Sequence, residues 1–479
     1  MNRTTVDLQR LVLAIVAAGA MIVGLGSCGG GAVGSGGTGR AQTGQSVGTV
    51  NGFGSVIVDG VSYDVLGARV VSEVAPSVDV VAEIKLGERV SISYEAAGVA
   101  REVRIETTLS GPVADVSPSG LTVLGQAISI NEGGGPGPRT QFGGGYVNVG
   151  DVSLGDSIDI YGVPVQGAPF YSIQATRIEK RADLPSFLRV TGVVSSVSRT
   201  NVVTFVLAGL TVDATNAAVL PSGWALMDGE TVTLLAPLAT LTQSSGAKPL
   251  VHAAQVRILK LESGGLEDIV SGSIAKIDVA AQTFFLGSLK VSYNAAVVMP
   301  VGTTLANRQY VKVEGALDID GTLVATNVER RDGDSGNEST LRGNISAYDA
   351  VAKRLMVRDV LTDVGSATLE GCPAAGLSNG LFVEIEGSLS GNGVVARQIH
   401  CESESSGSTV EREGTATLVD VALRRFTLML EHGALIVVQW SDKTFFGDVS
   451  PATLSGKKVE VEASLVEGVL QATKVKAED

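Results

Sequence analysis

Residues 311–321 read Val-Lys-Val-Glu-Gly-Ala-Leu-Asp-Ile-Asp-Gly, so apolar and polar side chains alternate along most of the run. Successive side chains of a β-strand point to opposite faces, and a period of two therefore indicates a strand with one buried face. The buried face would carry Val311, Val313, Leu317 and Ile319, and the wet face Lys312, Glu314, Ala316 and Asp318. The Asp-Gly pair at residues 320–321 then predicts a β-hairpin, because a type I′ turn needs positive φ at both central positions.

The same pattern recurs along the chain from residue 46 onward. A first anchor, a Gly followed by alternating apolar residues, occurs at Gly48, Gly111, Gly192, Gly272, Gly343 and Gly414. A second anchor, a turn Gly before a strand, occurs at Gly87, Gly155, Gly229, Gly380 and Gly456, while the fourth repeat lacks this Gly and has Arg308 and Gln309 before its strand. A closing strand is the third anchor. We therefore predict six β repeats over residues 46–108, 109–181, 188–261, 268–331, 340–402 and 411–477.

The composition also favours an all-β fold, with 60 Gly among 479 residues and 44% hydrophobic residues. Each repeat would hold about five strands, and a small open sheet exposes edges that proteins avoid. We therefore expect six tandem, separate β-barrels of an OB-like kind. Polar linkers would join them at residues 180–186, 262–268, 332–339 and 402–408, and the Gly-rich insertion at residues 133–145 would be a mobile loop.

The N-terminus has the features of a lipoprotein signal peptide. Arg3 and Arg10 precede an apolar run of about 15 residues, which is too short to span a bilayer comfortably. Small residues then precede Cys28, as in the lipobox of bacterial lipoproteins. We predict a signal peptide at residues 1–27, acylation of Cys28 and a Gly-rich tether at residues 28–45, with an ordinary signal peptide as the alternative. Gly29 after the Cys favours the outer membrane of a bacterial cell envelope.

Charge and side-chain patterns exclude some functions and leave others open. A formal net charge of −14 argues against nucleic-acid binding, which needs clustered Lys and Arg. The three histidines, His252, His400 and His432, fall in different repeats, so a metal or triad site would have to form across repeats. We predict no catalytic residue, no cofactor and no metal site.

Three further motifs have a plain structural interpretation. Asp332, Asp334, Asn337 and Glu338 imitate a calcium loop, but the Gly of an EF-hand is misplaced, which favours a solvated linker. Gly52, Gly54 and Gly60 are better explained by turns than by a phosphate loop. Trp224 and Trp440 could mark a binding surface, although single tryptophans are more often core residues.

Cys372 and Cys401 are the cysteines that remain once Cys28 is acylated, and both fall in the fifth repeat. Export would place them where disulfides form and persist, so we predict that they pair. The alternative, a two-thiol metal or redox pair, lacks further ligands nearby in the sequence. A bridge would pin the variable connection of the repeat to its closing strand.

Residues 52–60 read Gly-Phe-Gly-Ser-Val-Ile-Val-Asp-Gly and are followed by Val61 and Tyr63. This stretch resembles the opening repeat of proteobacterial envelope lipoproteins built from domain-of-unknown-function family 5666. The later turns and closing strands are similar to that repeat, so the resemblance covers most of residues 46–477. The family has no assigned activity, and the resemblance implies no catalytic residue. Arg308 and the insertion at residues 133–145 depart from the pattern.

Three classes of function follow. The first is a non-catalytic, lipid-anchored envelope protein whose repeats form a scaffold or binding surface for envelope proteins or glycans. The second is a specific small-ligand or cation-binding envelope protein. The third is an envelope enzyme, which would need convergent carboxylates that the linear sequence does not show. Besides the membrane reached through the lipid, the expected partner is thus an envelope protein or glycan.

Overall fold

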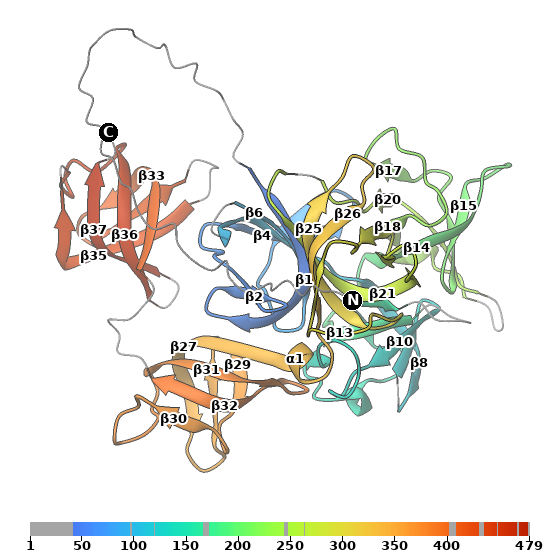
Figure 1. The fold of residues 1–479 in the computed structure, drawn as a ribbon. Helices are drawn as coiled ribbons and strands as arrows, with labels where there is room; N and C mark the ends of the chain where they lie inside the picture. The colour runs from blue at the N-terminus through green and yellow to red at the C-terminus, as the bar shows by residue number, and fades with distance from the viewer. Residues whose placement is uncertain are drawn as a thin grey trace, which may run out of the picture. The chain divides into compact units, whose positions relative to one another are not determined.

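The computed structural model describes residues 42–477, apart from 96–97, 119, 166–171, 244–247, 263, 402–408, 431–434, 448 and 467–468. Strands make up about 60% of the structure and helix almost none, which confirms the all-β class (Figure 1). The predicted signal peptide, Cys28 and most of the tether lie outside the described residues. None of the helices within the described part is long and apolar enough to cross a membrane.

The strands follow the six repeats in order. The first repeat holds β1 (Gly44–Phe53), β2 (Val56–Val58), β3 (Val61–Tyr63), β4 (Arg69–Ala75), β5 (Val78–Val81), β6 (Arg89–Tyr94) and β7 (Ala100–Ile105). The second holds β8 (Leu109–Ser117), β9 (Gly120–Val123), β10 (Gln126–Ile130), β11 (Gln141–Gly143), β12 (Ser157–Val165) and β13 (Ser172–Lys180). The third holds β14 (Phe187–Ser198), β15 (Thr204–Leu207), β16 (Leu210–Asp213), β17 (Ala218–Leu220), β18 (Thr231–Pro237), β19 (Leu250–His252) and β20 (Gln255–Ile258).

The later repeats are built in the same way. The fourth holds β21 (Asp268–Asp278), β22 (Thr283–Leu286), β23 (Leu289–Ser292), β24 (Val297–Met299), β25 (Tyr310–Leu317) and β26 (Leu323–Arg330). The fifth holds β27 (Glu338–Asp349), β28 (Arg354–Val357), β29 (Val360–Asp363), β30 (Thr368–Glu370), β31 (Phe382–Leu389) and β32 (Gly393–Cys401), after the short helix α1 (Asp334–Asn337). The sixth holds β33 (Thr409–Asp420), β34 (Arg425–Met429), β35 (Leu435–Phe446), β36 (Lys458–Val466) and β37 (Val469–Ala477).

The first anchor marks one register that all six repeats share. Each opening Gly lies directly across an antiparallel pair from the second residue of a later strand: Val90, Ile158, Val232, Val311, Val383 and Val459. A Cβ atom at Gly48 would lie 2.5 Å from Cγ1 of Val58, and one at Gly414 would lie 2.5 Å from the carbonyl oxygen of Met429. At these two positions Gly is needed because another strand passes too close for a side chain.

The second anchor is a turn residue with positive φ in every repeat. The φ angles at Gly87, Gly155, Gly229, Gly380 and Gly456 lie between 76° and 90°, and Arg308 has a φ of 75°. In each case the backbone N–H donates to the carbonyl two residues after the opening Gly: Val50, Val113, Val194, Ile274, Ile345 and Ala416. The fourth repeat therefore keeps the turn geometry although it lacks the Gly.

We expect Arg308→Gly to stabilise the fourth repeat by about 0.5–1 kcal/mol, because a residue with a Cβ pays a steric cost in the left-handed region that Gly does not. The Arg308 side chain is exposed, so its loss removes little packing. Gly229→Ala, whose Cβ would meet nothing within 4 Å, is the matched opposite and should destabilise the third repeat. Amide hydrogen exchange resolved by repeat would test both, and a destabilising Arg308→Gly would contradict the argument.

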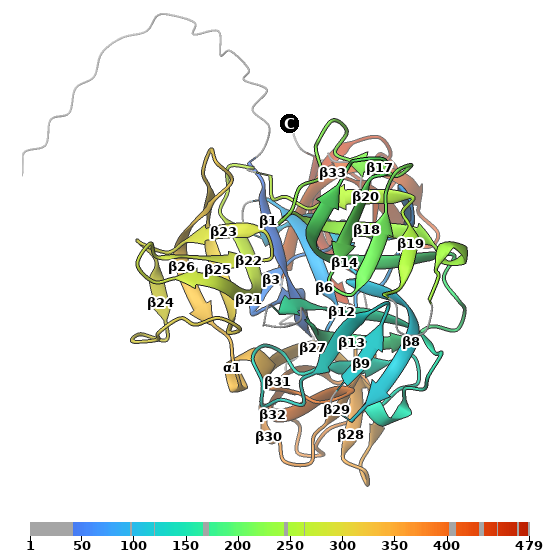
Figure 2. The same ribbon diagram turned by 90° about the vertical axis from the view of Figure 1, so that its right-hand side faces the viewer.

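The expectation of six separate barrels joined by polar linkers is wrong. The strands of the first, fourth and fifth repeats belong to one 19-stranded sheet, and those of the second and third to one 13-stranded sheet. β1 pairs in parallel with β21 through Ser46 and Val47 and with β27 through Phe53, and β14 pairs with β8 (Figure 2). Strands β33 to β37 form a closed barrel of their own. The first five repeats are thus not separate barrels, because strand edges left open in one repeat are paired by strands of another.

The first repeat makes direct contacts with each of the other five. Besides the pairing of β1 with the fourth and fifth repeats, three ion pairs reach the second, third and sixth repeats: Lys85 with Glu179, Glu73 with Arg189, and Asp64 with Arg412. The repeats are therefore not units that touch only their neighbours in sequence.

Two segments expected to be solvated are held by contacts instead. In the predicted linker at residues 332–339, the Asn337 side chain accepts a hydrogen bond from the backbone N–H of Arg139 at 2.8 Å. Within the insertion expected to be a mobile loop, Phe142 is buried, and β11 pairs in parallel with β13. The linker and the insertion are therefore in direct contact with each other. The amino-acid composition of the two segments does not indicate this contact.

The hairpin predicted at residues 311–321 is present, with three differences. Gly321 alone of the two central residues has a positive φ, of 76°, and the loop closes by a hydrogen bond from Asp318 N–H to the carbonyl of Thr322, so the turn is not type I′. Val311 and Val313 are buried as predicted, but Ile319 lies fully exposed in the turn. Lys312 is buried on the face expected to be wet, where it pairs with Glu314 and Glu329 at 3.1 and 3.0 Å.

Candidate functional site

A cavity of about 620 Å³ lies where the first four repeats meet. Its walls come from β1 and β6 of the first repeat, β12 of the second, β14 of the third, and β21 with the β22–β23 hairpin of the fourth. This volume lies within the range of sites that hold small ligands. It is therefore a candidate binding site, open to solvent on one side, among the described residues.

Direct hydrogen bonds between repeats fix the walls of the cavity. The backbone N–H of Gln45 donates to Oδ1 of Asp268 at 2.9 Å, which joins β1 to the start of β21. At the hairpin of the fourth repeat, the N–H of Ser288 donates to Oγ1 of Thr231 in the third repeat, also at 2.9 Å. The cavity is thus built into the arrangement of the repeats.

Arg89 is the buried cation of this cavity, with a residue exposure of 9%. Its guanidinium donates to the carbonyl oxygen of Ser271 at 2.9 Å, to the Tyr310 hydroxyl at 3.2 Å and to Oγ1 of Thr49 at 3.3 Å. The Tyr310 hydroxyl in turn donates to the carboxylate of Asp59, at 3.0 and 3.1 Å from its two oxygens. The carboxylate of Asp59 therefore connects to the Arg89 guanidinium through the Tyr310 hydroxyl and not by direct contact.

Two serine hydroxyls in the cavity wall have no hydrogen-bond partner. Ser271 and Ser273 lie on β21, on either side of the opening Gly of the fourth repeat, and are 2% and 5% exposed. A buried hydroxyl without a partner costs free energy, so such groups mark places where a ligand atom could be accepted.

A second buried charge cluster lies between the first and third repeats. The Glu73 carboxylate on β4 contacts Arg189 on β14 at 3.3 Å and Arg257 on β20 at 2.6 Å. The side chains of Glu73 and Arg189 are 2% and 6% exposed. Gln255 also donates to Glu73 at 3.0 Å, so this carboxylate satisfies three donors from one neighbouring repeat.

Glu88 is a buried carboxyl group at the boundary between the first and second repeats. Burial raises the pKa of Glu88 to about 7, against smaller lowering effects from the N–H of Lys85 and the charge of Arg177. A carboxyl group whose pKa is raised on folding favours the folded state at low pH and loses that contribution as pH rises toward the folded pKa. Glu88 therefore weakens this boundary above neutral pH.

We expect Glu88→Gln to stabilise the first repeat by roughly 3 kcal/mol at pH 8 relative to its effect near pH 4.5, because one pKa unit corresponds to about 1.4 kcal/mol. Gln keeps the shape of the side chain and an oxygen that can accept from Lys85, while it removes the ionisation. Hydrogen exchange of β6 between pH 5 and 8 would measure the difference. Glu83→Gln, at an exposed position on the same connection, is the control, and equal pH profiles for wild type and Glu88→Gln would contradict the argument.

The structure does not bring the histidines and the acidic residues of the calcium-loop-like motif together. His252 is exposed and lies 3.2 Å from Asp213, His400 is exposed on β32, and His432 lies outside the described residues. Asp332 accepts a hydrogen bond from the N–H of Tyr310 at 3.1 Å. Within the described part of the chain, no group of three or more His, Cys, Asp or Glu side chains is placed to hold a metal ion.

The two tryptophans have different environments. Trp440 is buried in the core of the sixth repeat, where its ring packs on Phe426 and Phe446. Trp224 is 46% exposed, and the Lys260 ammonium lies over its ring at 4.2 Å. Because Lys260 also lines the cavity, Trp224 stands next to the candidate site without forming part of its wall.

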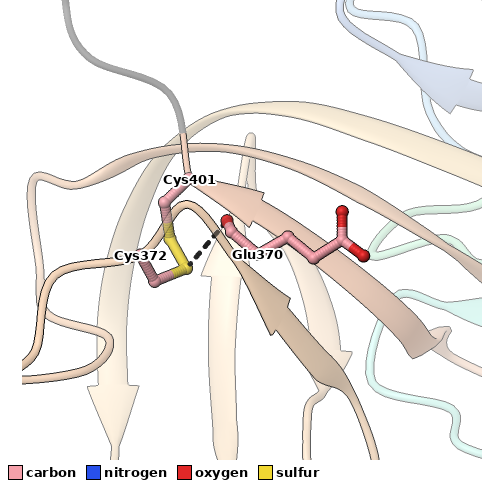
Figure 3. The surroundings of a disulfide bond; sticks show 3 residues. All are labelled: Glu370, Cys372 and Cys401. Atoms are coloured by element: carbon pink, nitrogen blue, oxygen red, sulfur yellow. Dashed lines mark hydrogen bonds between the residues drawn. A yellow bond between two sulfur atoms is a disulfide. The ribbon is translucent and has the colours of Figure 1, made fainter.

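Cys372 and Cys401 form a disulfide, with Cα atoms 4.7 Å apart (Figure 3). β30 runs parallel to the end of β32, with Glu370 opposite His400, and the bridge ties the two strands together just beyond this pairing. The predicted lipidation residue, Cys28, lies outside the described residues.

The residues that define the cavity were not among the sequence candidates. Arg89, Ser271 and Ser273 occupy ordinary strand positions, and their side chains matter because strands more than 180 residues apart meet there. The available signal was weak: polar residues flank the opening Gly of the fourth repeat on both sides.

Comparison with known proteins identifies the family. The model of the family described as Domain of unknown function (DUF5666) matches residues 110–179, 271–329, 342–400 and 413–476, which together span more than half of the chain. The chain belongs to this family, and it is a repeat-containing member. The matches fall in four of the six predicted repeats, and no curated protein matches.

Two solved structures are similar to parts of the chain. A structure of apo-CusF from Escherichia coli is 12% identical, with a TM-score of 0.14, over 16% of this chain and 96% of its own. The CSD456 segment of Drosophila Unr is 14% identical, with a TM-score of 0.19, over 44% of this chain and 97% of its own. TM-scores this low carry no argument, and the expected OB-like character gains no support from them.

Proposed function

We propose that this chain is a non-catalytic protein of the bacterial cell envelope, anchored by a lipid on Cys28, that uses its joined repeats as a binding scaffold for envelope proteins or glycans. The cavity at the junction of four repeats carries this proposal, because several repeats must be held together to form it. Hydrogen bonds between the repeats support a preformed site, which lowers the entropic cost of binding. The lipoprotein features of residues 1–28 support the compartment.

A thermal-shift screen with muropeptides and envelope oligosaccharides would test binding at the cavity. Lys290 lies at its rim with an exposed side chain, so Lys290→Trp should block entry while it leaves the fold intact. Arg397→Trp, at an exposed position in the fifth repeat, is the matched control. We expect a ligand that raises the melting temperature of wild type and Arg397→Trp but not of Lys290→Trp. A shift that is equal in all three proteins, or absent from all, would reject the proposed site.

The anchor has its own test. We expect Cys28→Ser to move the protein from the membrane fraction to the soluble fraction, because several acyl chains hold a protein far more firmly than one, at about 0.8 kcal/mol per buried methylene. Fractionation with immunoblotting would measure the change, and Cys372→Ser serves as the control for loss of a cysteine as such. Membrane retention of Cys28→Ser after cleavage of the signal peptide would count against the lipid anchor.

A further inference from the structure

We propose that the cavity between the first four repeats binds the carboxylate of a small ligand with an aliphatic body, through Arg89, Ser271 and Ser273. This inference rests on the proposed function, since it names the ligand class that the same cavity would accept. It concerns the chemistry of the site and not the identity of one metabolite.

Arg89 supplies the charge for carboxylate recognition. A guanidinium carries five N–H donors, and three hydrogen bonds of Arg89 go to Ser271, Tyr310 and Thr49. Two N–H groups are therefore left for a ligand. Among the described residues, no carboxylate lies within 4.0 Å of this guanidinium, so the buried cation has neutral direct partners only. An incoming carboxylate would give it a charge-assisted contact.

The two serines supply further donors and are the independent sign of a ligand. Both residues line the same cavity and are at least nine-tenths buried, and their hydroxyl groups have no partner. The carbonyl oxygen of Ser271 also accepts a hydrogen bond from the Arg89 guanidinium at 2.9 Å. The residue that carries one unpartnered hydroxyl is therefore in direct contact with the buried cation. Three donors of this kind match the acceptor oxygens of a single carboxylate.

Four acidic residues line the cavity, and none has a carboxylate within 4.0 Å of the Arg89 guanidinium. Glu230 pairs with Lys260 at 3.4 Å through Oε1, although its Oε2 has no partner, and Glu106 pairs with Arg189 at 3.4 Å. Asp320 lies in the exposed turn of the fourth repeat. The carboxylate of Asp228 accepts a hydrogen bond from the N–H of Val197 at 2.9 Å. The balance of positive and negative side chains in the cavity wall therefore differs from the formal net charge of −14 of the whole chain.

The remaining wall suits an aliphatic body better than a sugar ring. Val47, Val163, Pro164, Leu289 and Leu317 line the cavity, and none of its described lining residues is aromatic. Sugar rings are commonly recognised by stacking on aromatic faces, which this wall does not offer. Apolar walls with a few placed polar groups are the usual composition of a small-ligand site.

Hexanoate is the probe that tests the proposal, with 1-hexanol as its neutral match. We expect isothermal titration of the full chain to show binding of hexanoate at least tenfold tighter than binding of 1-hexanol. N-acetyl-leucine, added as a third probe, would bind more tightly than hexanoate if the natural source is a peptide C-terminus and more weakly if it is a free acid. Equal binding of hexanoate and 1-hexanol, or binding of neither, would overturn the proposal.

Serine variants keep the test independent of folding. Ser271→Ala and Ser273→Ala remove hydroxyls that have no partner, so the melting temperature should stay unchanged or rise, while hexanoate affinity falls about tenfold. Ser157→Ala removes an equally unpartnered buried hydroxyl outside the cavity and should leave affinity unchanged. Arg89→Gln should abolish hexanoate binding. Unaltered affinity in both serine variants would overturn the assignment even if Arg89→Gln fails to fold.

The two proposals can fail separately. If envelope oligosaccharides bind in a manner blocked by Lys290→Trp but hexanoate does not bind, the carboxylate site is wrong and the binding scaffold stands. If hexanoate binds and no envelope component does, the site is right and the proposed envelope role is wrong.

Discussion

Glu73→Gln will destabilise the contact between the first and third repeats by about 3–5 kcal/mol, which is the usual cost of removing one partner from a buried ion pair. The substitution keeps the size of the side chain but leaves Arg189, whose side chain is 6% exposed, without its direct countercharge on β4. Arg257 loses a contact of 2.6 Å at the same time. Hydrogen exchange of β4 and β14 should rise by more than a hundredfold, whereas exchange in β36 should not change.

An exposed pair provides the matched control for this prediction. Arg397 and Glu386 lie 3.2 Å apart with side chains that are 70% and 50% exposed, so Glu386→Gln should cost no more than about 1 kcal/mol. If Glu73→Gln and Glu386→Gln have equal effects, the buried pair does not hold the repeats together. Exchange that rises throughout the chain would instead show that the first repeat supports every sheet at once.

Opening the disulfide will destabilise the fifth repeat by about 3–4 kcal/mol, as the chain-entropy model gives for a closed loop of about 30 residues. Cys372→Ser is the better variant because Cys372 is only partly buried, whereas Cys401 belongs to the core of the repeat. The loss should be local, with faster exchange in β30 and β32 and little change in β36. Exchange measured by mass spectrometry on peptides would show this.

Reduction of the wild-type protein is the natural control, since it breaks the same bond without changing a residue. We expect reduced wild type and oxidised Cys372→Ser to give the same exchange pattern in the fifth repeat. Two free thiols in the unreduced wild-type protein, or no difference on reduction, would contradict a structural role for the bridge.

Much of the local structure could be predicted because it depends on short-range sequence. The opening Gly residues recur at one shared register position, and the turn residues recur because each repeat needs the same positive φ, which Arg308 also adopts. Alternation placed Val311 and Val313 inside correctly. The disulfide candidates followed from the number of cysteines left in one repeat.

The arrangement of the repeats could not be predicted in the same way. Lys312 lies on a face that alternation marks as wet, yet it is buried and pairs there with two glutamates of its own hairpin. Alternation in the sequence of a strand indicates that one face is apolar, but it does not indicate what will cover the other face. For the same reason, the polar segments between repeats were predicted to be linkers. The sequence positions of Arg89, Ser271 and Ser273 did not indicate a binding site.

The pairing of β1 with β21 has a consequence for synthesis of the chain. The hydrogen bond from Gln45 to Asp268 can form only after the 223 residues that follow Gln45 have been synthesised. At translation rates of about 5–20 residues per second, the growing polypeptide spends roughly 11 to 45 s with that early strand unmatched. During this interval the first repeat lacks the strand that pairs with the β21 side of β1, and this strand edge is open to pairing with other chains. Correct folding therefore requires that the edge stays unpaired or is covered until β21 has been synthesised.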